Sequence, residues 1–365
     1  MGSVWGHSIK VSLFGESHGA AIGCVIDGLP PGVTVDFAAV DAQMARRAPG
    51  RYRFSTPRRE SDRYEVLSGL FHGCTTGAPL AVVIRNENTR SEDYCQDVLR
   101  PGHADYTAWV KFKGFADFRG GGHFSGRLTA PLVFAGAVVR QILGEQGIVL
   151  GSRILRIYDV EDEAMAAEEI PALPPDAFPV KSPGAKERMQ RAIEAAGEAG
   201  DSVGGVAECV ALNVPAGLGE PFFHSLESHL AALMFSVPAV KGVEFGDGFA
   251  LAGMLGSRAN DPMFWEDATG ACTEAGAGAV KFDSNHNGGI NGGIANGQPL
   301  VCRVAVKPTP SVRLVQKTVD IRRGESVETA LQGRHDPCIV PRALPVLEAV
   351  MALGIYDLFV HSRKG

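Results

Sequence analysis

The pattern of hydrophobic and polar positions divides this chain into short apolar runs and longer amphipathic or apolar segments. Short runs rich in β-branched residues and bounded by Gly, Pro or Asp predict strands. These runs occupy 8–14, 21–27, 64–71, 79–85, 152–158, 204–213, 239–245, 249–255 and 299–306. Longer segments predict helices at 36–47, 103–112, 127–146, 185–198, 222–235 and 341–360. Since strands and helices do not alternate regularly, the pattern indicates an α+β fold.

The chain also resembles itself at a constant spacing. GESHGAAIGCVIDGLPPG at 15–32 and GDSVGGVAECVALNVPAG at 200–217 share seven identical residues at an offset of 200 − 15 = 185. Further similar pairs are VLSGLFHG (66–73) with ALAGMLGS (250–257), and GAPLAVVI (77–84) with GQPLVCRV (297–304). The alternative is chance similarity between Gly- and Pro-rich turns, but matched flanking elements favour an internal duplication.

The duplication predicts one domain over 1–365 with pseudo-two-fold halves. The halves span about 8–150 and 200–360. The segment 159–199 begins with an acidic, proline-rich stretch and is interpreted as a surface excursion between them. Ligand-binding loops of the two halves would then meet where the halves pack together.

Composition narrows the class of protein. With 45% hydrophobic residues, 21% charged residues and a net charge of −6, the chain is typical of a globular protein without a general affinity for nucleic acid. No secretory signal and no membrane-spanning apolar run is visible. Seven scattered cysteines without a CxxC pair indicate reduced thiols, so we expect a cytoplasmic protein.

Five glycine-rich loops carry a histidine or an acid. They read GESHG (15–19), RPGHAD (100–105), RGGGHFSGRLTA (119–130), SNHNGGINGG (284–293) and GRHDPC (333–338). Glycine lets backbone amides approach a ligand closely. The loops therefore predict one anion-binding site built from many segments, with His18, His103 and Asp336 as candidate acid–base groups. A structural role for each of these residues remains the alternative.

A basic segment lies inside this acidic protein. Residues 46–63 contain seven arginines and no lysine, with Glu60 and Asp62 as the only acids. Arginine forks bind phosphates and carboxylates bidentately, so the segment predicts a pocket for a small anion. A solvated loop or an RNA-contacting patch is the alternative. No HxH, HExxH or paired His/Cys spacing indicates a metal.

The ordered motifs resemble the chorismate synthase family. GESHG, RRAPGR with TPRRESD, RPGHADY, RGGGxxSxRxT, DSVGG, PAVKGVEFGDG, SNHNGGINGG, KPTPS and GRHDPC follow one another as they do in that family, from about Trp5 to His361. The resemblance implies a β-α sandwich and a lyase that converts 5-enolpyruvylshikimate 3-phosphate to chorismate by anti-1,4-elimination of phosphate. It implies reduced FMN without net redox change, and a homotetramer. NADPH is implied only if the chain reduces its own flavin.

The resemblance also implies roles for individual residues. His103 resembles the histidine that protonates the reduced flavin, His18 the one near the substrate phosphate, and Asp336 the aspartate that assists the flavin. Matches to residues that bind substrate or nucleotide are Ser17, Arg46, Arg47 and Arg53. Matches to flavin contacts are Ser125, Arg127, Pro238, Ala239, Gly292, Lys307, Pro308, Thr309, Pro310, Ser311 and Arg334.

One loop departs from the family pattern. Many members read GGGRSSARETA where this chain reads GGGHFSGRLTA, so His123 and Phe124 replace an arginine and a serine. The flavin contacts assigned to these two positions are therefore in doubt. Two rival functions are open: a flavin-independent phosphometabolite transferase, and an RNA-binding module that uses the basic loop. FMN binding by the protein would exclude both.

Overall fold

The computed structural model describes residues 2–55, 60–87, 94–174, 178–265, 280–331 and 336–363. Its N-terminal half contributes a five-stranded antiparallel sheet in the order β1-β2-β3-β7-β4. The strands are β1 (Val4–Trp5), β2 (Lys10–Gly15), β3 (Ala21–Asp27), β7 (Leu80–Arg85) and β4 (Tyr64–Ser68). At the centre, Cys24 of β3 pairs with Leu13 and Val82, and fully buried Cys24 and Val82 face the core.

The C-terminal half contributes a second five-stranded antiparallel sheet, in the order β11-β16-β10-β8-β9. The strands are β11 (Val240–Phe245), β16 (Leu300–Val306), β10 (Gly205–Leu212), β8 (Val149–Ile157) and β9 (Val160–Glu161). Cys209 of β10 pairs with Cys302 and Ser152. The two sheets have equivalent neighbour orders, because β2-β3-β7-β4 matches β8-β10-β16-β11 strand for strand.

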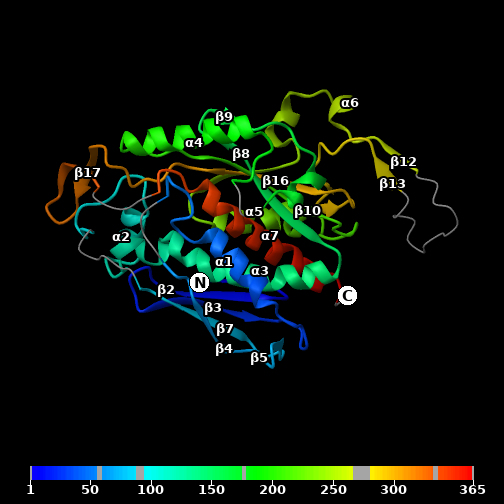
Figure 1. Cartoon of the computed structure of the whole chain (residues 1–365), viewed down its shortest axis with the longest axis horizontal. Helices are drawn as coiled ribbons and strands as arrows, with labels where there is room; N and C mark the ends of the chain where they lie inside the picture. Colours follow the sequence, from blue (N-terminus) through cyan, green and yellow to red (C-terminus); the bar gives the residue numbers. More distant parts are fainter. Residues whose placement is uncertain are drawn as a thin grey trace.

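A layer of helices separates the two sheets (Figure 1). It consists of α1 (Phe37–Arg47), α3 (Thr129–Glu145), α5 (Leu226–Ser236) and α7 (Val340–Ser362). A Cβ on Gly136 of α3 would lie 2.3 Å from Cβ of Ala349 in α7, so glycine is needed for this close crossing. Helices α3 and α7 are apolar on nearly every side because both sheets cover them.

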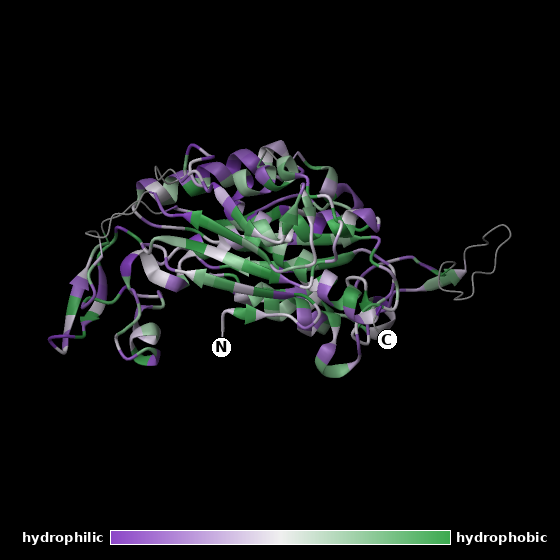
Figure 2. Ribbon diagram, turned by 90° about the horizontal axis from the view of Figure 1, so that it is seen from below, coloured by the Kyte–Doolittle hydropathy of each residue, from purple (hydrophilic) through white to green (hydrophobic). Residues whose placement is uncertain are grey.

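Smaller elements surround these layers. Helix α2 (Asp105–Lys111) follows the RPGHAD loop, and α4 (Pro183–Glu198) covers the outer face of the second sheet (Figures 1 and 2). Short hairpins and helices complete the fold: β5 (Leu70–Phe71) with β6 (Cys74–Thr75), β12 (Met263–Trp265) with β13 (Val280–Phe282), β14 (Ile290–Asn291) with β15 (Ile294–Ala295), β17 (Gln316–Asp320) with β18 (Glu325–Thr329), and α6 (Gly256–Ala259). The 3₁₀ segments are η2 (Arg119–Phe124), η3 (Gly126–Leu128), η4 (Ala167–Ala172), η5 (Phe222–His224) and η6 (Gly248–Gly253).

The α+β class is confirmed, and the predicted helices and most predicted strands are present. The strand expected at 249–255 is wrong, because this segment forms the 3₁₀ turn η6. The chain turns back at Gly246 and Gly248, which both have positive φ. The Phe249 amide then donates to the Glu244 carboxylate at 3.2 Å. Phe249 and Leu255 are exposed, so hydrophobic character alone misled the prediction.

Among the described residues, two helical stretches are long and apolar enough by composition to span a membrane, Arg119–Glu145 and Val340–Ser362. In the most apolar 18-residue window of each stretch, 78% and 89% of the residues are buried inside the fold, as expected for core helices.

Candidate active site

Both halves of the chain line one large cavity of about 890 Å³. Its walls come from the N-terminal arm, the RPGHAD loop, the glycine loop η2 with the start of α3, the turn between α5 and β11, residues 307–311 and the start of α7. Among the described lining residues, six are basic and two are acidic. The basic residues are Arg47, Arg100, Arg127, Lys241, Lys307 and Arg342, and the acidic ones are Glu60 and Asp336. An acidic protein thus concentrates positive charge at this cavity, which suits an anionic ligand.

The glycine loop places backbone directly against two histidines. Gly120, Gly121 and Gly122 have φ of 58°, 83° and 53°, a conformation that L-side chains rarely adopt. A Cβ on Gly120 would lie 2.4 Å from the His18 ring, and one on Gly121 would lie 3.2 Å from the His103 ring. The sequence therefore needs glycine here both for backbone conformation and for space, and the loop holds His18 and His103 on either side of it.

His103 is held by two neighbours in its own loop. Its Nδ1 lies 2.6 Å from Oδ1 of Asp105, and Nη2 of Arg100, 3.1 Å from the same nitrogen, donates to that carboxylate oxygen at 2.7 Å. Burial would raise the pKa of Asp105, but hydrogen bonds from His103 and Arg100 hold that pKa well below its usual value. A charged Asp105 fixes an Nδ1–H tautomer, so Nε2, on the edge that faces Gly121, is left for proton transfer.

His18 and Ser17 lie behind the glycine loop rather than on the cavity wall. The Ser17 amide donates to the Gly122 carbonyl at 3.1 Å, and the His18 ring meets Tyr94 edge-on at 5.3 Å. The Ser17 hydroxyl is fully buried and has no hydrogen-bond partner within the part of the chain that the structure describes. A buried hydroxyl in this condition points to a ligand that would complete its hydrogen bonding.

Arg47 lies in a buried cluster of charges at the cavity wall. Its Nη1 lies 2.6 Å from Asp62, which also accepts from Arg127, and its Nε donates to Thr129 at 3.1 Å. Burial, assisted by Arg342 and Arg127, lowers the pKa of Arg47 to about 10 against the opposing effect of Asp62. The pKa of Asp62 is held below its ordinary value by the two guanidiniums, although burial opposes this.

The 307–311 segment and the start of α7 continue this wall, where Arg342 Nε donates to the Arg47 carbonyl at 3.0 Å. Asp336 is paired with Arg342, and Thr309 donates to the Asp336 carbonyl at 2.9 Å. Lys307 Nζ lies 2.6 Å from the Gly102 carbonyl and so joins this wall to the RPGHAD loop. Ala239 has φ of 73°, a strained conformation for a residue with a Cβ, of the kind that clusters at functional sites.

His123 and Phe124, the two residues of the glycine loop that differ from the family pattern, both line the cavity. His123 Nδ1 donates to the Gly15 carbonyl at 2.7 Å, and its Nε2 lies 2.9 Å from the Ser3 hydroxyl. Both ring nitrogens therefore have partners within the protein. Phe124 packs 6.2 Å from the Phe112 ring and extends an aromatic surface over the cavity.

Many of the residues assigned to the site from sequence are brought together at this cavity. They are Arg47, His103, His123, Phe124, Ser125, Arg127, Pro238, Ala239, Lys307, Thr309, Pro310, Ser311 and Asp336. Ser125 also begins η3, where its hydroxyl accepts from the Arg127 amide. Arg334, with Arg58 and Arg59 of the basic segment, lies outside the described residues.

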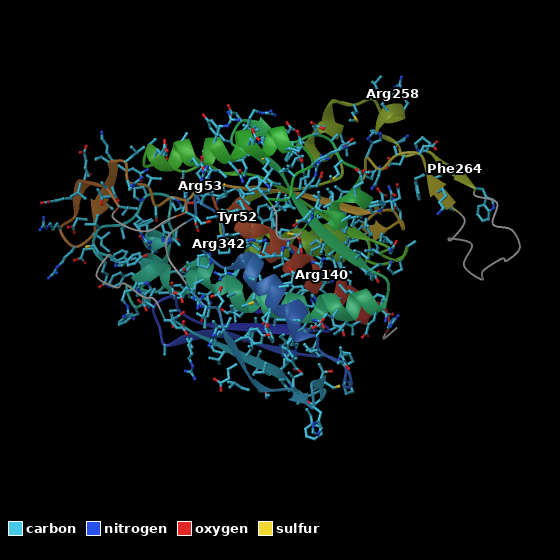
Figure 3. All side chains as sticks on the ribbon, viewed as in Figure 1. Tyr52, Arg53, Arg140, Arg258, Phe264 and Arg342 are labelled. Carbon is cyan, nitrogen blue, oxygen red and sulfur yellow. The ribbon has the colours of Figure 1, made fainter. Side chains whose placement is uncertain are left out.

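Besides His18 and Ser17, four assigned residues do not line the cavity. Arg46 forms a bidentate pair with buried Glu348, at 2.7 and 2.8 Å, and Arg140 binds the same carboxylate. Arg53 is 85% exposed and binds Glu194 of α4 (Figure 3). Gly292 lies in the turn between β14 and β15, and Pro308 is in the wall segment without facing the cavity.

Sequence reasoning missed Asp105, Asp62 and Arg342 as parts of the site. The spacing of His103 and Asp105 was a usable signal, since a carboxylate two residues beyond a histidine can reach its Nδ1. For Asp62, the only signal in the sequence was its position in the arginine-rich segment 46–63. Arg342 carried no local signal, because its partner Asp336 is recognised only once α7 is placed.

The fold and the cavity together define an enzyme that acts on a small anionic metabolite, with proton-transfer groups beside anion-binding groups. The family model for chorismate synthase matches residues 9–360. A chorismate synthase of Thermococcus gammatolerans is 49% identical over 98% of each chain, and one of Korarchaeum cryptofilum is 43% identical over 100% of this chain and 99% of the relative. A crystal structure of chorismate synthase superposes with a TM-score of 0.75 at 28% identity, covering 99% of this chain and 94% of the other. The chain belongs to the chorismate synthase family, whose members are lyases of the shikimate pathway.

Proposed function

We propose that the 890 Å³ cavity is where this lyase eliminates phosphate from 5-enolpyruvylshikimate 3-phosphate to give chorismate. The observation that carries the assignment is the glycine loop, which holds His18 and His103 on its two sides next to a cavity lined mainly by cations. In the reaction, the C3–O bond breaks and its electrons leave with phosphate. The C6 hydrogen is removed from the opposite face, and a second ring double bond forms.

Reduced FMN is the proposed cofactor, and the cavity fits such a group. Its volume lies within the range of about 300–1,000 Å³ that ligand sites occupy. The Ser125 hydroxyl, the amides of the glycine loop and the Phe124 ring offer polar and aromatic contacts. When bound, reduced FMN would supply an electron-rich partner for loss of phosphate and of the C6 hydrogen, without net oxidation.

The chain's own residues would hold charges and protons around these groups. His18 and Ser17 would support, from behind, the glycine loop whose backbone faces the leaving phosphate, and His103 would hold or release a proton at Nε2 under the orienting effect of Asp105. Asp336, beside Arg342, would accept a hydrogen bond from the flavin side. Arg47 would contribute positive charge at the wall while its fork stays bound to Asp62.

We also propose features of the fold, the assembly and the cofactor supply. We infer an internal duplication, supported by the equivalent strand orders of the two sheets, and expect a homotetramer in the cytoplasm. We infer that an external reductant supplies reduced FMN and that no nucleic acid takes part. Mass by light scattering tests the tetramer, and NADPH oxidation with FMN tests self-reduction.

Anaerobic turnover of 5-enolpyruvylshikimate 3-phosphate decides the function. Purified protein with dithionite-reduced FMN should release phosphate and chorismate in equal amounts, and oxidised FMN should support none. Equal turnover without FMN would favour a flavin-independent transferase. Tight binding of RNA without FMN binding would favour the basic-loop module.

A further inference from the structure

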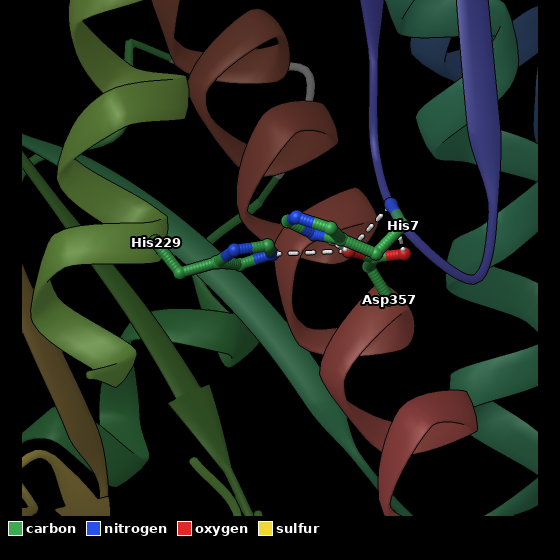
Figure 4. Close-up of side chains that lie close together, drawn as sticks. All are labelled: His7, His229 and Asp357. Atoms are coloured by element: carbon green, nitrogen blue, oxygen red, sulfur yellow. Dashed lines mark hydrogen bonds and ion pairs between the residues drawn. The ribbon is translucent and has the colours of Figure 1, made fainter. Parts of the chain in front are cut away.

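A second cluster of polar side chains lies where three distant segments meet, away from the glycine loop. His7 follows β1 in the N-terminal arm, His229 belongs to α5 and Asp357 belongs to α7 (Figure 4). One ring nitrogen from each histidine and one carboxylate oxygen lie within 4.8 Å of one another. The residues are far apart in the chain, so no sequence spacing could have indicated the cluster.

The distances within this cluster are longer than those of ordinary histidine–carboxylate hydrogen bonds. His7 Nδ1 and His229 Nε2 lie 3.4 and 3.5 Å from the same Oδ2 of Asp357. The same structure places His103 and His286 only 2.6 Å from their carboxylate partners. Four ligands bound tetrahedrally at about 2.0–2.1 Å lie about 3.3 Å from one another. The two distances to Asp357 match the spacing of metal ligands better than that of hydrogen bonds, and the two ring nitrogens lie within 4.8 Å of each other.

The surrounding bonds leave the ligand atoms available. Oδ1 of Asp357 accepts from the amides of His7, Ser8 and Ile9, at 3.1, 2.6 and 2.9 Å, which fixes the carboxylate. Its Oδ2 faces the two rings (Figure 4) and accepts from the His7 amide at 3.2 Å, which leaves it a further lone pair for an ion. The His229 side chain is only 8% exposed, and its Nε2 has no hydrogen-bond partner among the described residues. An imidazole nitrogen buried in this way is costly unless it is paired.

We propose that His7 Nδ1, His229 Nε2 and Asp357 Oδ2 bind a divalent transition metal ion of the zinc class. Two imidazoles and a carboxylate are a usual ligand set for such an ion. Water or the exposed His224, whose ring lies 5.8 Å from that of His7, takes the fourth position. The side chain of His7 is 64% exposed, so an ion can enter from solvent.

The site would fasten the N-terminal arm to α5 and α7. That arm forms part of the cavity wall, through residues 2–5. The Ser3 hydroxyl lies 2.9 Å from His123 in the glycine loop, and the Trp5 ring lies 5.2 Å from that of His229. A bound ion therefore has a structural role in ordering the wall, and no chemical role in the elimination.

Metal titration of the untagged full-length protein tests the proposal. After treatment with chelator, Zn²⁺ is added and followed by calorimetry, and Co²⁺ is added and followed by its tetrahedral visible absorption. Wild type should bind one ion per chain. His7→Ala and His229→Gln should each bind at least about 100-fold more weakly, since loss of even an outer partner of a metal ligand costs about 10–100-fold.

His72→Asn is the matched control. His72 is an exposed histidine with φ of 50°, a conformation that asparagine tolerates, and it should bind metal like wild type. Zinc should also slow hydrogen exchange in residues 2–9 of wild type, and it should have no such effect in His7→Ala. Because His7→Ala changes an exposed side chain, this variant keeps the test valid even if His229→Gln fails to fold. The proposal is overturned if wild type binds no ion, or if His7→Ala binds as tightly as His72→Asn.

Discussion

His103 and Asp105 form a pair in which Nδ1 of the ring lies 2.6 Å from Oδ1 of the carboxylate. The edge of the ring that carries Nε2 and Cε1 lies against Gly121 of the glycine loop. The pair thus presents Nε2 toward the loop that we assign to ligand binding, and Asp105 controls which nitrogen carries the proton. We therefore propose that His103 is a catalytic residue and that Asp105 positions it.

The first prediction concerns this pair. His103→Ala should lower kcat by about 10²–10⁴-fold, the range found for positioned acid–base groups. Asp105→Asn should lower kcat by a smaller factor and leave FMN affinity nearly unchanged, because it alters the tautomer and not the cavity. Rates under saturating reduced FMN measure both effects.

A double-variant cycle separates positioning from an independent effect. If Asp105 acts through His103, Asp105→Asn should cost almost nothing further in the His103→Ala background. Fully multiplicative losses would contradict the role given to Asp105. The Asp105→Glu variant, which keeps the charge, should recover part of the rate.

The second prediction concerns the glycine loop. Gly120→Ala places a Cβ 2.4 Å from the His18 ring at φ of 58°, so we expect about 1–3 kcal/mol of destabilisation and loss of FMN binding. Gly126→Ala is the control, because its Cβ would meet nothing within 4 Å. Urea unfolding and FMN titration measure both variants. Wild-type FMN affinity in Gly120→Ala would remove this loop from the site.

The third prediction distinguishes Arg47 from Arg53, which the sequence analysis assigned to the same binding role. Arg47→Ala removes one partner of a buried ion pair with Asp62 and should cost about 3–5 kcal/mol in the free energy of unfolding. Arg53→Ala removes an exposed pair with Glu194 and should leave the free energy of unfolding unchanged. Urea denaturation at neutral pH distinguishes them. A stable Arg47→Ala variant would show that Arg127 alone satisfies Asp62.

The sequence predicted those features of the fold that depend on residues close together in the chain. Local patterns predicted β3 at 21–27 and α1 at 36–47 to within a residue, because a bounded apolar run, the Asp36 cap and helical periodicity are properties of neighbouring residues. The glycine loop was also visible, since positive φ requires glycine. By contrast, Phe249 lies in an apolar run that is exposed to solvent and forms η6. The absence of a neighbouring strand to pair with this run is not visible in the local sequence.

Side-chain partners that come from distant segments of the chain could not be predicted from the sequence. Arg46 has the same neighbours in the chain as Arg47, yet its fork is occupied by Glu348 of α7. His7, His229 and Asp357 meet only because α5 and α7 are adjacent. Sequence motifs could therefore predict which loops carry chemistry, and packing decided which side chains reach the cavity.

The fourth prediction concerns stability in acid. Burial would raise the pKa of Glu348, but Arg46 and Arg140 hold it below its ordinary value, and Asp62 and Asp105 are lowered in the same direction. A lowered folded-state pKa means that the unfolded chain binds more protons. Stability is therefore fully present above the unfolded pKa of about 4 and is lost as pH falls through the folded-state values.

Urea midpoints between pH 7 and pH 2 measure this effect. Wild type should lose stability below about pH 4. Glu348→Gln should be less stable than wild type at pH 7, because Arg46 and Arg140 lose their charged partner, and its decline in acid should be shallower. Identical declines in the two proteins would exclude Glu348 as a source of the acid dependence.

The fifth prediction concerns His123, which replaces the arginine of many relatives. One hypothesis is that protonated His123 supplies the missing cation, and FMN affinity would then fall as pH rises. The structure places its Nδ1 on the Gly15 carbonyl and its Nε2 on the Ser3 hydroxyl, which can donate to a neutral ring or accept from a charged one. Both protonation states keep both bonds, so FMN binding need not select either state.

We therefore expect parallel FMN titrations at pH 6 and pH 8 for wild type and His123→Ala. The variant should instead loosen the N-terminal arm, because Ser3 loses its partner, and hydrogen exchange in residues 2–5 should be faster than in wild type. Ser3→Ala is the matched control, since it removes the same contact from the other side and should reproduce the exchange effect. A pH dependence of FMN affinity present in wild type and absent in His123→Ala would restore the charge hypothesis, because only a proton on His123 distinguishes those two titrations.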